Sequence, residues 1–304
     1  VDLARLPKTR NAAPLTLKSR ARSLIKIGKD PDMAELNLAP GEALYYEYNA
    51  ATRHMQTFIF VNALTGNTEM WSGSICETLQ TAGYGTLVYN FRGQEQTTFG
   101  DATALTPSLI VEDLCELIHH LKPPSPILVG LSIGGLFAAQ AYLAGAKTTG
   151  LVLINTLRKP TQRLNWINRA MVDLARVGGG RMVMTANIPV IASPGLIANL
   201  WDSTFTDEPF DPPNPTDGLF RLMEGSLATE WDFPYENLAC PVLILTGEHD
   251  RLFRIDGDVN ELKARIPDAR EKRYPDAGHL IPLEAPDDFT DDLLGFARRC
   301  ASAS

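Results

Sequence analysis

The sequence predicts an α/β protein with a doubly wound, mostly parallel sheet and an inserted helical cap. Three observations predict this fold class. Short apolar runs rich in β-branched residues recur along the chain, and helical segments alternate with them. One interval of about 85 residues between two of these runs contains no convincing core strand. The chain has 304 residues, of which 44% are hydrophobic, so it can bury a sizeable core.

The core of the sheet is expected to come from five apolar runs, at 57–64, 85–91, 126–132, 151–155 and 241–247. These runs are almost uniformly apolar, which is typical of strands covered by helices on both faces. Residues 36–49 precede them and indicate two short strands around a Pro-Gly turn. Residues 270–275 are expected to form the last strand.

Helices are expected at 107–121, which ends before two prolines, and at 132–146, directly after the third apolar run. The long interval contains helical segments around 162–177 and 218–228, and an ordinary crossover is far shorter. The chain is therefore divided into an N-terminal extension (1–35), an α/β core (36–157 and 236–304) and a helical cap, or lid (158–235).

Composition narrows the class of partner. The net charge is −8, and an acidic body repels phosphates, so no nucleic acid is expected to bind. The segment 1–30 carries an excess of basic residues, which favours a solvated or packed extension over contact with an anionic partner. No apolar run approaches the roughly 18 residues that span a bilayer, so no membrane span is expected. The four cysteines are far apart, which favours reduced thiols in a cytoplasmic protein. No oligomeric state follows from the sequence.

The strongest chemical signal is Gly130-Leu131-Ser132-Ile133-Gly134, a G-x-S-x-G pattern between an apolar run and a helix rich in small residues. A serine nucleophile at the top of a sheet sits on a sharp strand-to-helix turn. Small residues two positions before and after the serine allow that turn without clashes. The helix that follows directs its positive end at the reacting oxygen. The sequence therefore predicts Ser132 as a nucleophile.

A serine hydroxyl needs a base, and that base needs an acidic partner. Of the five histidines, His279 alone lies in a late loop that can return over the carboxyl edge of the sheet. Asp250 follows the run 241–247 at the same edge, with Glu248 as the nearest rival. The other usual place for such an acid, after 151–155, has no carboxylate. We therefore expect Asp250 to orient His279.

In chain order, GLSIGG, TGEHD and DAGH resemble the corresponding motifs of the α/β-hydrolase superfamily. The resemblance covers 36–157 and 236–304. It implies an oxyanion hole formed by the backbone N–H groups of Ile133 and Leu64. Family members usually have His-Gly where this chain has Asn62-Ala63, and Asn62 is expected to hold the loop or to touch substrate. Arg92 matches a family loop and is expected to be structural.

The cap contains three of the four tryptophans and four of the seven methionines. Such side chains make an adaptable apolar surface. They can either pack the cap onto the core or face substrate, and the candidate contacts are Trp166, Trp201 and Trp231. No metal-ligand cluster, phosphate loop or dinucleotide motif follows a strand, so neither a metal nor a cofactor is expected.

The leading hypothesis is a serine hydrolase acting on a carboxylic ester or thioester of a small, apolar acyl substrate. A lactone, a carbon–carbon bond next to a ketone, or acyl transfer would use the same three side chains. A different class of protein, a hydrolase-like receptor that binds an apolar ligand without turnover, is the competing hypothesis. Because proteins with this fold catalyse many different reactions, the fold does not identify which of these substrates is used.

Overall fold

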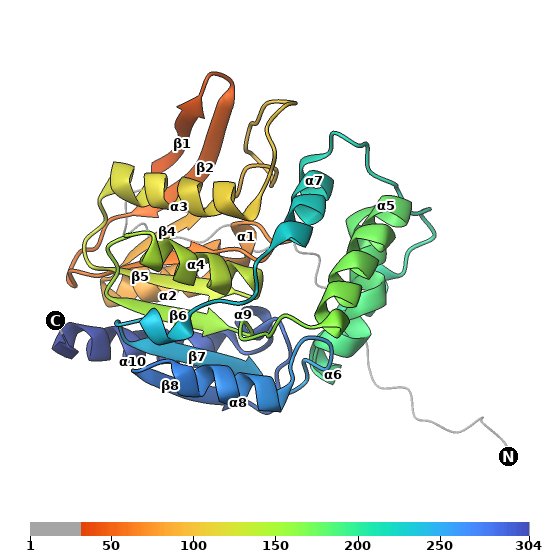
Figure 1. The fold of residues 1–304 in the computed structure, drawn as a ribbon. Helices are drawn as coiled ribbons and strands as arrows, with labels where there is room; N and C mark the ends of the chain where they lie inside the picture. The colour runs from red at the N-terminus through yellow and green to blue at the C-terminus, as the bar shows by residue number, and fades with distance from the viewer. Residues whose placement is uncertain (1–31, 304) are drawn as a thin grey trace, which may run out of the picture. The chain divides into compact units, whose positions relative to one another are not determined.

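The computed structural model describes residues 32–303 and contains one sheet with helices on both faces (Figure 1). The sheet order is β1-β2-β4-β3-β5-β6-β7-β8. The strand β2 pairs antiparallel with both β1 and β4, and every later pairing is parallel. The strands are β1 (Asp32–Ala39), β2 (Glu42–Asn49), β3 (Thr57–Val61), β4 (Gly85–Tyr89), β5 (Pro126–Leu131), β6 (Gly150–Ile154), β7 (Val242–Gly247) and β8 (Ala269–Tyr274).

The strand order reverses between β3 and β5, which lie side by side although β4 comes between them in the sequence. Crevices at such a point, beyond the carboxyl ends of the strands, are the usual binding sites of open α/β sheets. The loop after β3 and the turn after β5 therefore meet at the position where the sequence predicts an oxyanion hole and a nucleophile.

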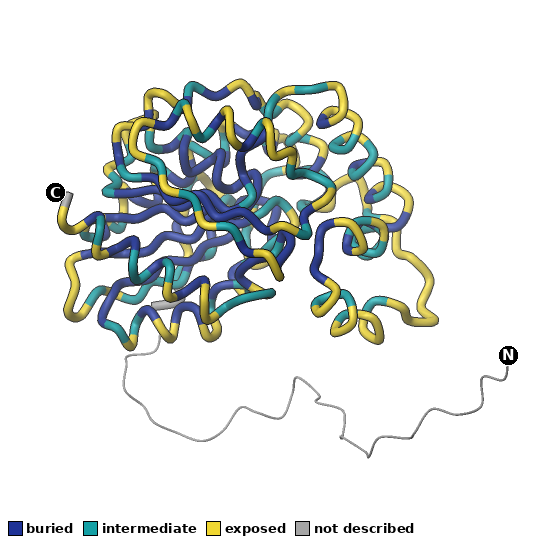
Figure 2. The backbone as a smooth tube through the Cα atoms, turned by 90° about the horizontal axis from the view of Figure 1, so that it is seen from below, coloured by how far each residue is buried: buried dark blue, intermediate teal, exposed yellow. Residues whose placement is uncertain are grey.

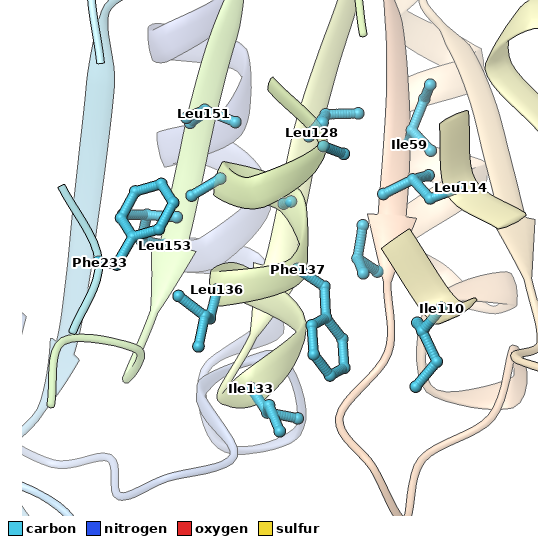
Figure 3. Close-up of a cluster of buried hydrophobic side chains, with 14 of the residues drawn as sticks. Ile59, Ile110, Leu114, Leu128, Ile133, Leu136, Phe137, Leu151, Leu153 and Phe233 are labelled. Carbon is cyan, nitrogen blue, oxygen red and sulfur yellow. The ribbon is translucent and has the colours of Figure 1, made fainter. Parts of the chain in front are cut away.

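Alternate side chains of the central strands enter two separate hydrophobic cores. Ile59 and Val61 of β3 pack with the helices of one face, whereas Phe58 and Phe60 pack on the other face. Figure 3 shows part of the first core, in which side chains of α3 (Pro107–Leu121) and α4 (Ile133–Leu143) face those of β3, β5 and β6. Burial on both faces explains why these strands lack polar alternation.

The other helices complete the two layers and the cap. The second core packs against α1 (Glu69–Ser72), α2 (Ser74–Ala82), α9 (Ile281–Glu284) and α10 (Pro286–Ala303), and the first core also receives α8 (Asp256–Arg265). Figure 2 shows the central strands β3 to β7 as the continuously buried part of the chain, with exposed residues on the outer turns of the helices. The short 3-10 helices are Ser226–Ala228 and Tyr235–Asn237.

The segment between β6 and β7 is helical. It contains α5 (Gln162–Ile191), α6 (Pro194–Thr204) and α7 (Gly218–Gly225), which lie beside the end of the sheet toward which β6 and β7 point (Figure 1). Gly179, at a φ of 66°, interrupts the helical geometry of α5, so the glycine run at 178–180 makes a kink between two helical parts. We call this helical segment between β6 and β7 the cap.

Some boundaries differ from the sequence expectations. The strand β1 begins at Asp32, inside the expected extension, and the remainder of that extension lies outside the described residues. The helix α6 was not expected, although Ser193 caps its N-terminus and Pro194 occupies its first turn, both of which are helix-start signals.

Arg92 holds the loop after β4 by a buried ion pair. Its guanidinium donates from Nε and Nη2 to the two carboxylate oxygens of Asp113 on α3, at 2.8 and 2.6 Å. Its Nη1 also pairs with Glu42 on β2. The buried cation is thus neutralised by two carboxylates, and the structural role expected for Arg92 agrees with these contacts.

Replacing Asp113 by leucine should lower the free energy of unfolding by about 3–5 kcal/mol, because it leaves the Arg92 charge buried with one partner fewer. Urea denaturation measures this change. The double variant Arg92→Met/Asp113→Leu should recover part of the loss, because the cation is then removed as well. The control is Asp173→Leu on α5, whose ion pairs are exposed and should contribute about 1 kcal/mol or less. An Asp113→Leu effect no larger than the control's would contradict this account.

Candidate active site

The chain turns sharply at Ser132, between β5 and α4. Ser132 has a φ of 60° and a ψ of −124°, a backbone conformation that non-glycine residues rarely adopt. A Cβ atom at Gly130 would lie 2.4 Å from the Gly135 Cα, and one at Gly134 would lie 2.2 Å from the Asn62 carbonyl oxygen. The glycines therefore let the turn pack on itself and on the end of β3, as the G-x-S-x-G pattern predicts.

Asp250 and His279 are brought together by the loops after β7 and β8. His279 Nδ1 lies 2.7 Å from Asp250 Oδ2, and both side chains are buried. The other carboxylate oxygen, Oδ1, accepts from the N–H groups of Leu252 and Phe253. Burial alone raises the pKa of Asp250, but His279, the Phe253 N–H and the positive charge of Arg158 outweigh it, so its pKa lies below the ordinary value. The rival acid, Glu248, is exposed.

Asn155 lies at the end of β6, at the position where the alternative acid would lie. Its side chain hydrogen-bonds to the backbone of the His279 loop and of β7. Its side-chain amide donates to the carbonyl oxygens of Gly278 and His279, at 3.1 and 2.9 Å. Its Oδ1 accepts from the N–H of Gly247, at the end of β7. Asn155 therefore ties the His279 loop to two neighbouring strands, a role that the sequence analysis did not identify.

The end of α5 is bonded directly to both loops. The carbonyl oxygen of Ile191 accepts from the N–H of His279 at 2.6 Å, and that of Val190 accepts from the N–H of Arg251 at 2.9 Å. The cap therefore does not merely lie near the histidine and the acid. Its backbone helps to fix the loops that carry them.

The two expected oxyanion donors reach the same cavity. Leu64 and Ile133 both line it, together with Ser132 and His279. Among the hydrogen bonds within residues 32–303, neither the N–H of Leu64 nor that of Ile133 has a protein acceptor. Both N–H groups therefore remain available to a ligand oxygen, Ile133 at the start of α4 and Leu64 after β3.

Asn62 faces away from this cavity and organises the loop that carries Leu64. Its amide donates to the carbonyl oxygen of Tyr89 and to the side chains of Asn90 and Gln94, while its Oδ1 accepts from Trp71 Nε1 at 2.7 Å. Asn62 is not among the residues that line the cavity. Of the two roles expected from the sequence, holding the loop is the one that these contacts fit.

The cavity above Ser132 has a volume of about 210 Å³ and is mostly apolar. The core contributes the floor, and the cap contributes much of the wall, including Met171, Val172, Val183, Met184, Met223 and Trp231. A larger hollow of about 470 Å³ borders it beside Thr65 and Met223, but is lined by neither Ser132 nor His279. We therefore place the candidate site in the smaller cavity, which both Ser132 and His279 line.

The three tryptophans of the cap do not share one environment. Trp231 is buried and lines the cavity. Trp166 on α5 is 80% exposed and Trp201 on α6 is 58% exposed, and neither lines the cavity. They lie on helix faces turned away from the site, so the structure does not place them where the sequence analysis expected substrate contacts.

Arg158 is the main residue that the sequence analysis missed. It lies just after β6, is 6% exposed, and its Nη2 donates to Ser132 Oγ at 2.8 Å and to the Asn155 carbonyl oxygen at 3.2 Å. Its guanidinium carbon lies 4.0 Å from the ring centre of Phe253 and 5.1 Å from that of Trp231. Burial lowers the pKa of Arg158 to about 10. Because Arg158 follows the strand predicted at 151–155, its position at the carboxyl edge of the sheet could have been inferred from the sequence.

Ser132 Oγ has its one side-chain hydrogen bond within the described residues with Arg158, not with His279. The hydroxyl accepts this bond, so its own proton stays free to be donated. Catalytic hydrogen bonds often shorten only when substrate is bound.

Residues 32–303 contain no cluster of three or more His, Cys, Asp or Glu side chains that could hold a metal ion. None of the helices in these residues is long and apolar enough to cross a membrane.

Comparison with known proteins places this geometry in a family. The family model described as alpha/beta hydrolase fold matches residues 56–286. A Mycobacterium tuberculosis protein that carries the name non-heme bromoperoxidase BpoC is 24% identical over an alignment of 249 positions, which covers 78% of this chain and 92% of that protein.

Two solved structures have the same fold. A thermophilic esterase from Thermogutta terrifontis is 22% identical with a TM-score of 0.71, over 90% of this chain and 99% of that one. The enol-lactonase from Burkholderia xenovorans is 21% identical with a TM-score of 0.69, over 84% and 96%. The family match spans more than half of the sequence and includes the turn at Ser132, the Asp250 loop and His279. The chain belongs to the alpha/beta hydrolase fold family and is a hydrolase enzyme.

Proposed function

We propose that this enzyme cleaves carboxylic esters of small, apolar acyl groups through Ser132, His279 and Asp250, by way of an acyl-enzyme. The observation that carries the proposal is the buried hydrogen bond between Asp250 and His279, beside a cavity that Ser132 also lines. A carboxylate that holds a neutral histidine in one tautomer prepares its Nε2 to accept a proton.

In the first half of the reaction, Ser132 Oγ attacks the ester carbonyl carbon and His279 Nε2 takes the hydroxyl proton. The carbonyl oxygen becomes an oxyanion, which the N–H groups of Ile133 and Leu64 stabilise. The bond to the alkoxy oxygen then breaks, and His279 gives the proton to the departing alcohol. Asp250 stabilises the imidazolium that exists between these two proton transfers.

In the second half, His279 takes a proton from water, whose oxygen attacks the acyl carbon. The same N–H groups hold the second oxyanion. The bond to Ser132 Oγ breaks and the serine recovers its proton from His279, which releases the acid. Every proton removed in one half is returned in the same half, so the scheme requires no other reactant than the ester and water.

The cavity wall favours an apolar acyl group, because binding becomes more favourable when apolar surface of the substrate is removed from water against methionine, valine and tryptophan side chains. The esterase among the structural neighbours agrees with an oxygen ester. A thioester, a lactone or a ketone-activated carbon–carbon bond presents the same electrophilic carbon to Ser132, and an alcohol or thiol in place of water would give acyl transfer.

A receptor without turnover would not need a buried Asp250–His279 pair, which is costly to keep desolvated.

The proposal predicts that the wild-type protein hydrolyses p-nitrophenyl butyrate and that Ser132→Ala lowers kcat on the order of 10⁴-fold or more, because no other hydroxyl occupies the turn. Release of p-nitrophenolate measures both rates. Asp250→Asn should lower kcat by a similar order, because it removes the carboxylate that fixes the histidine. The matched control is Glu248→Gln, which removes an exposed carboxylate two residues away and should leave kcat within about 2-fold. Equal activity of Ser132→Ala and wild type would refute the proposal.

The apolar wall predicts that Trp231 contributes to acyl selectivity. Trp231→Ala should lower the ratio of kcat/KM for p-nitrophenyl hexanoate to that for p-nitrophenyl acetate by about 10-fold, because a longer acyl chain loses apolar contact. A ratio within one variant does not depend on the fraction of folded protein. Trp166→Ala, on the outside of the cap, should leave the ratio unchanged. A ratio that falls with Trp166→Ala and not with Trp231→Ala would show that the cavity is not the acyl site.

A further inference from the structure

Two arginines of residues 32–303 are buried, and their surroundings differ. Arg92 is neutralised by Asp113 and Glu42. Arg158 is as deeply buried, yet within residues 32–303 no carboxylate lies within 4.0 Å of it. Its Nε has no hydrogen-bond acceptor, and both of its hydrogen bonds start from Nη2. A buried cation of this kind is costly unless an anion joins it.

The nearest acid cannot supply that anion. Asp250 stabilises the Arg158 charge only from a distance, and each of its oxygens has closer partners. Oδ2 bonds to His279, and Oδ1 accepts from the N–H groups of Leu252 and Phe253. No other arginine and no lysine, aspartate or glutamate lines the cavity. The Arg158 guanidinium therefore borders a cavity in which no described residue supplies an anion.

The rings of Phe253 and Trp231 lie against the guanidinium and hold it beside the nucleophile. Nε is buried, Nη2 donates to Ser132 and Asn155, and Nη1 has no hydrogen bond within the described residues. The Nη1–Nη2 end of the guanidinium is therefore the edge that can match the two oxygens of a carboxylate. Because Nη2 lies 2.8 Å from Ser132 Oγ, an anion bound there sits next to the carbon that Oγ attacks.

We propose that Arg158 is the receptor for a carboxylate carried by the substrate, so that the enzyme prefers esters with an ionised carboxylate a few atoms from the scissile carbonyl over neutral esters of equal size. This inference rests on the proposed function and names its substrate class. The carboxylate replaces Ser132 Oγ as the acceptor of Arg158, which leaves the hydroxyl to His279. The apolar wall then covers the carbon chain.

The test uses pairs of esters in which an isopropyl group replaces the carboxylate, so that the two esters match in size and shape and differ in charge. Monomethyl succinate is compared with methyl 4-methylpentanoate, which places the carboxylate on the acyl side, and acetoxyacetate is compared with isobutyl acetate, which places it on the alcohol side. In at least one pair the wild-type kcat/KM should be about 10- to 100-fold higher for the anion, the ratio expected for a charge-assisted hydrogen bond. Arg158→Met should abolish that ratio, and Arg158→Lys should keep part of it.

The control variant is Arg169→Met on α5, which removes an equal charge from an exposed side chain and should leave the ratio unchanged. A wild-type ratio near one in both pairs would overturn the proposal. An Arg158→Met variant that loses activity equally on anionic and neutral esters would also overturn it, and would make Arg158 a positioning residue for Ser132.

A binding measurement separates this inference from the proposed function, because it needs no turnover. Calorimetry with Ser132→Ala should detect monomethyl succinate or acetoxyacetate, and the affinity should fall at least 10-fold when Arg158→Met is added. If wild type hydrolyses no ester but this binding is present, the reaction is misassigned and the carboxylate site stands. If esters are hydrolysed but neither anion binds, the carboxylate site is refuted.

The urea midpoint gives a further readout. Arg158→Met should not lower it, because an apolar side chain replaces a buried charge among aromatic rings. A midpoint well below that of wild type would contradict the proposal, since Arg158 would then be retained for stability.

Discussion

The sharp turn at Ser132 is the constraint on which the rest of the site depends. The strained φ of 60° persists because the surrounding backbone packs too closely to relax, with Gly134 against the end of β3 and Gly130 against the first turn of α4. One turn thereby fixes two things. It presents the Ser132 hydroxyl at the carboxyl edge of the sheet, and it brings the Ile133 N–H beside the loop that carries Leu64.

Around this turn, the site is assembled from loops that hold one another. Asn155 ties the His279 loop to β6 and β7, and the last carbonyl oxygens of α5 accept hydrogen bonds from N–H groups of the Asp250 and His279 loops. The cap and the proposed catalytic groups therefore form one hydrogen-bonded unit. A displacement of α5 at Ile191 would therefore move the His279 loop as well as part of the cavity wall.

The sequence predicted the sheet, its buried strands and the meeting of Asp250 with His279, because local patterns carry them. Uniform apolar runs indicate buried strands, and residues that follow parallel strands meet at one edge. Arg158 and Asn155 escaped prediction because their roles depend on contacts between separate strand ends and loops, which no local pattern reveals. Arg158 contacts Ser132 and Trp231, and Asn155 contacts the His279 loop. Trp166 and Trp201 were only candidate substrate contacts, because composition shows that the cap is aromatic, but not which helix face each ring occupies.

Covalent trapping of the nucleophile tests the central claim, that Ser132 attacks an acyl carbon with His279 as its base, most directly. The protein is treated with a fluorophosphonate, digested, and mapped by tandem mass spectrometry. The account predicts one phosphonylated peptide, modified at Ser132, and a labelling rate that falls by orders of magnitude in His279→Ala. Modification of another serine, or labelling of folded protein that is equally fast without His279, would contradict it.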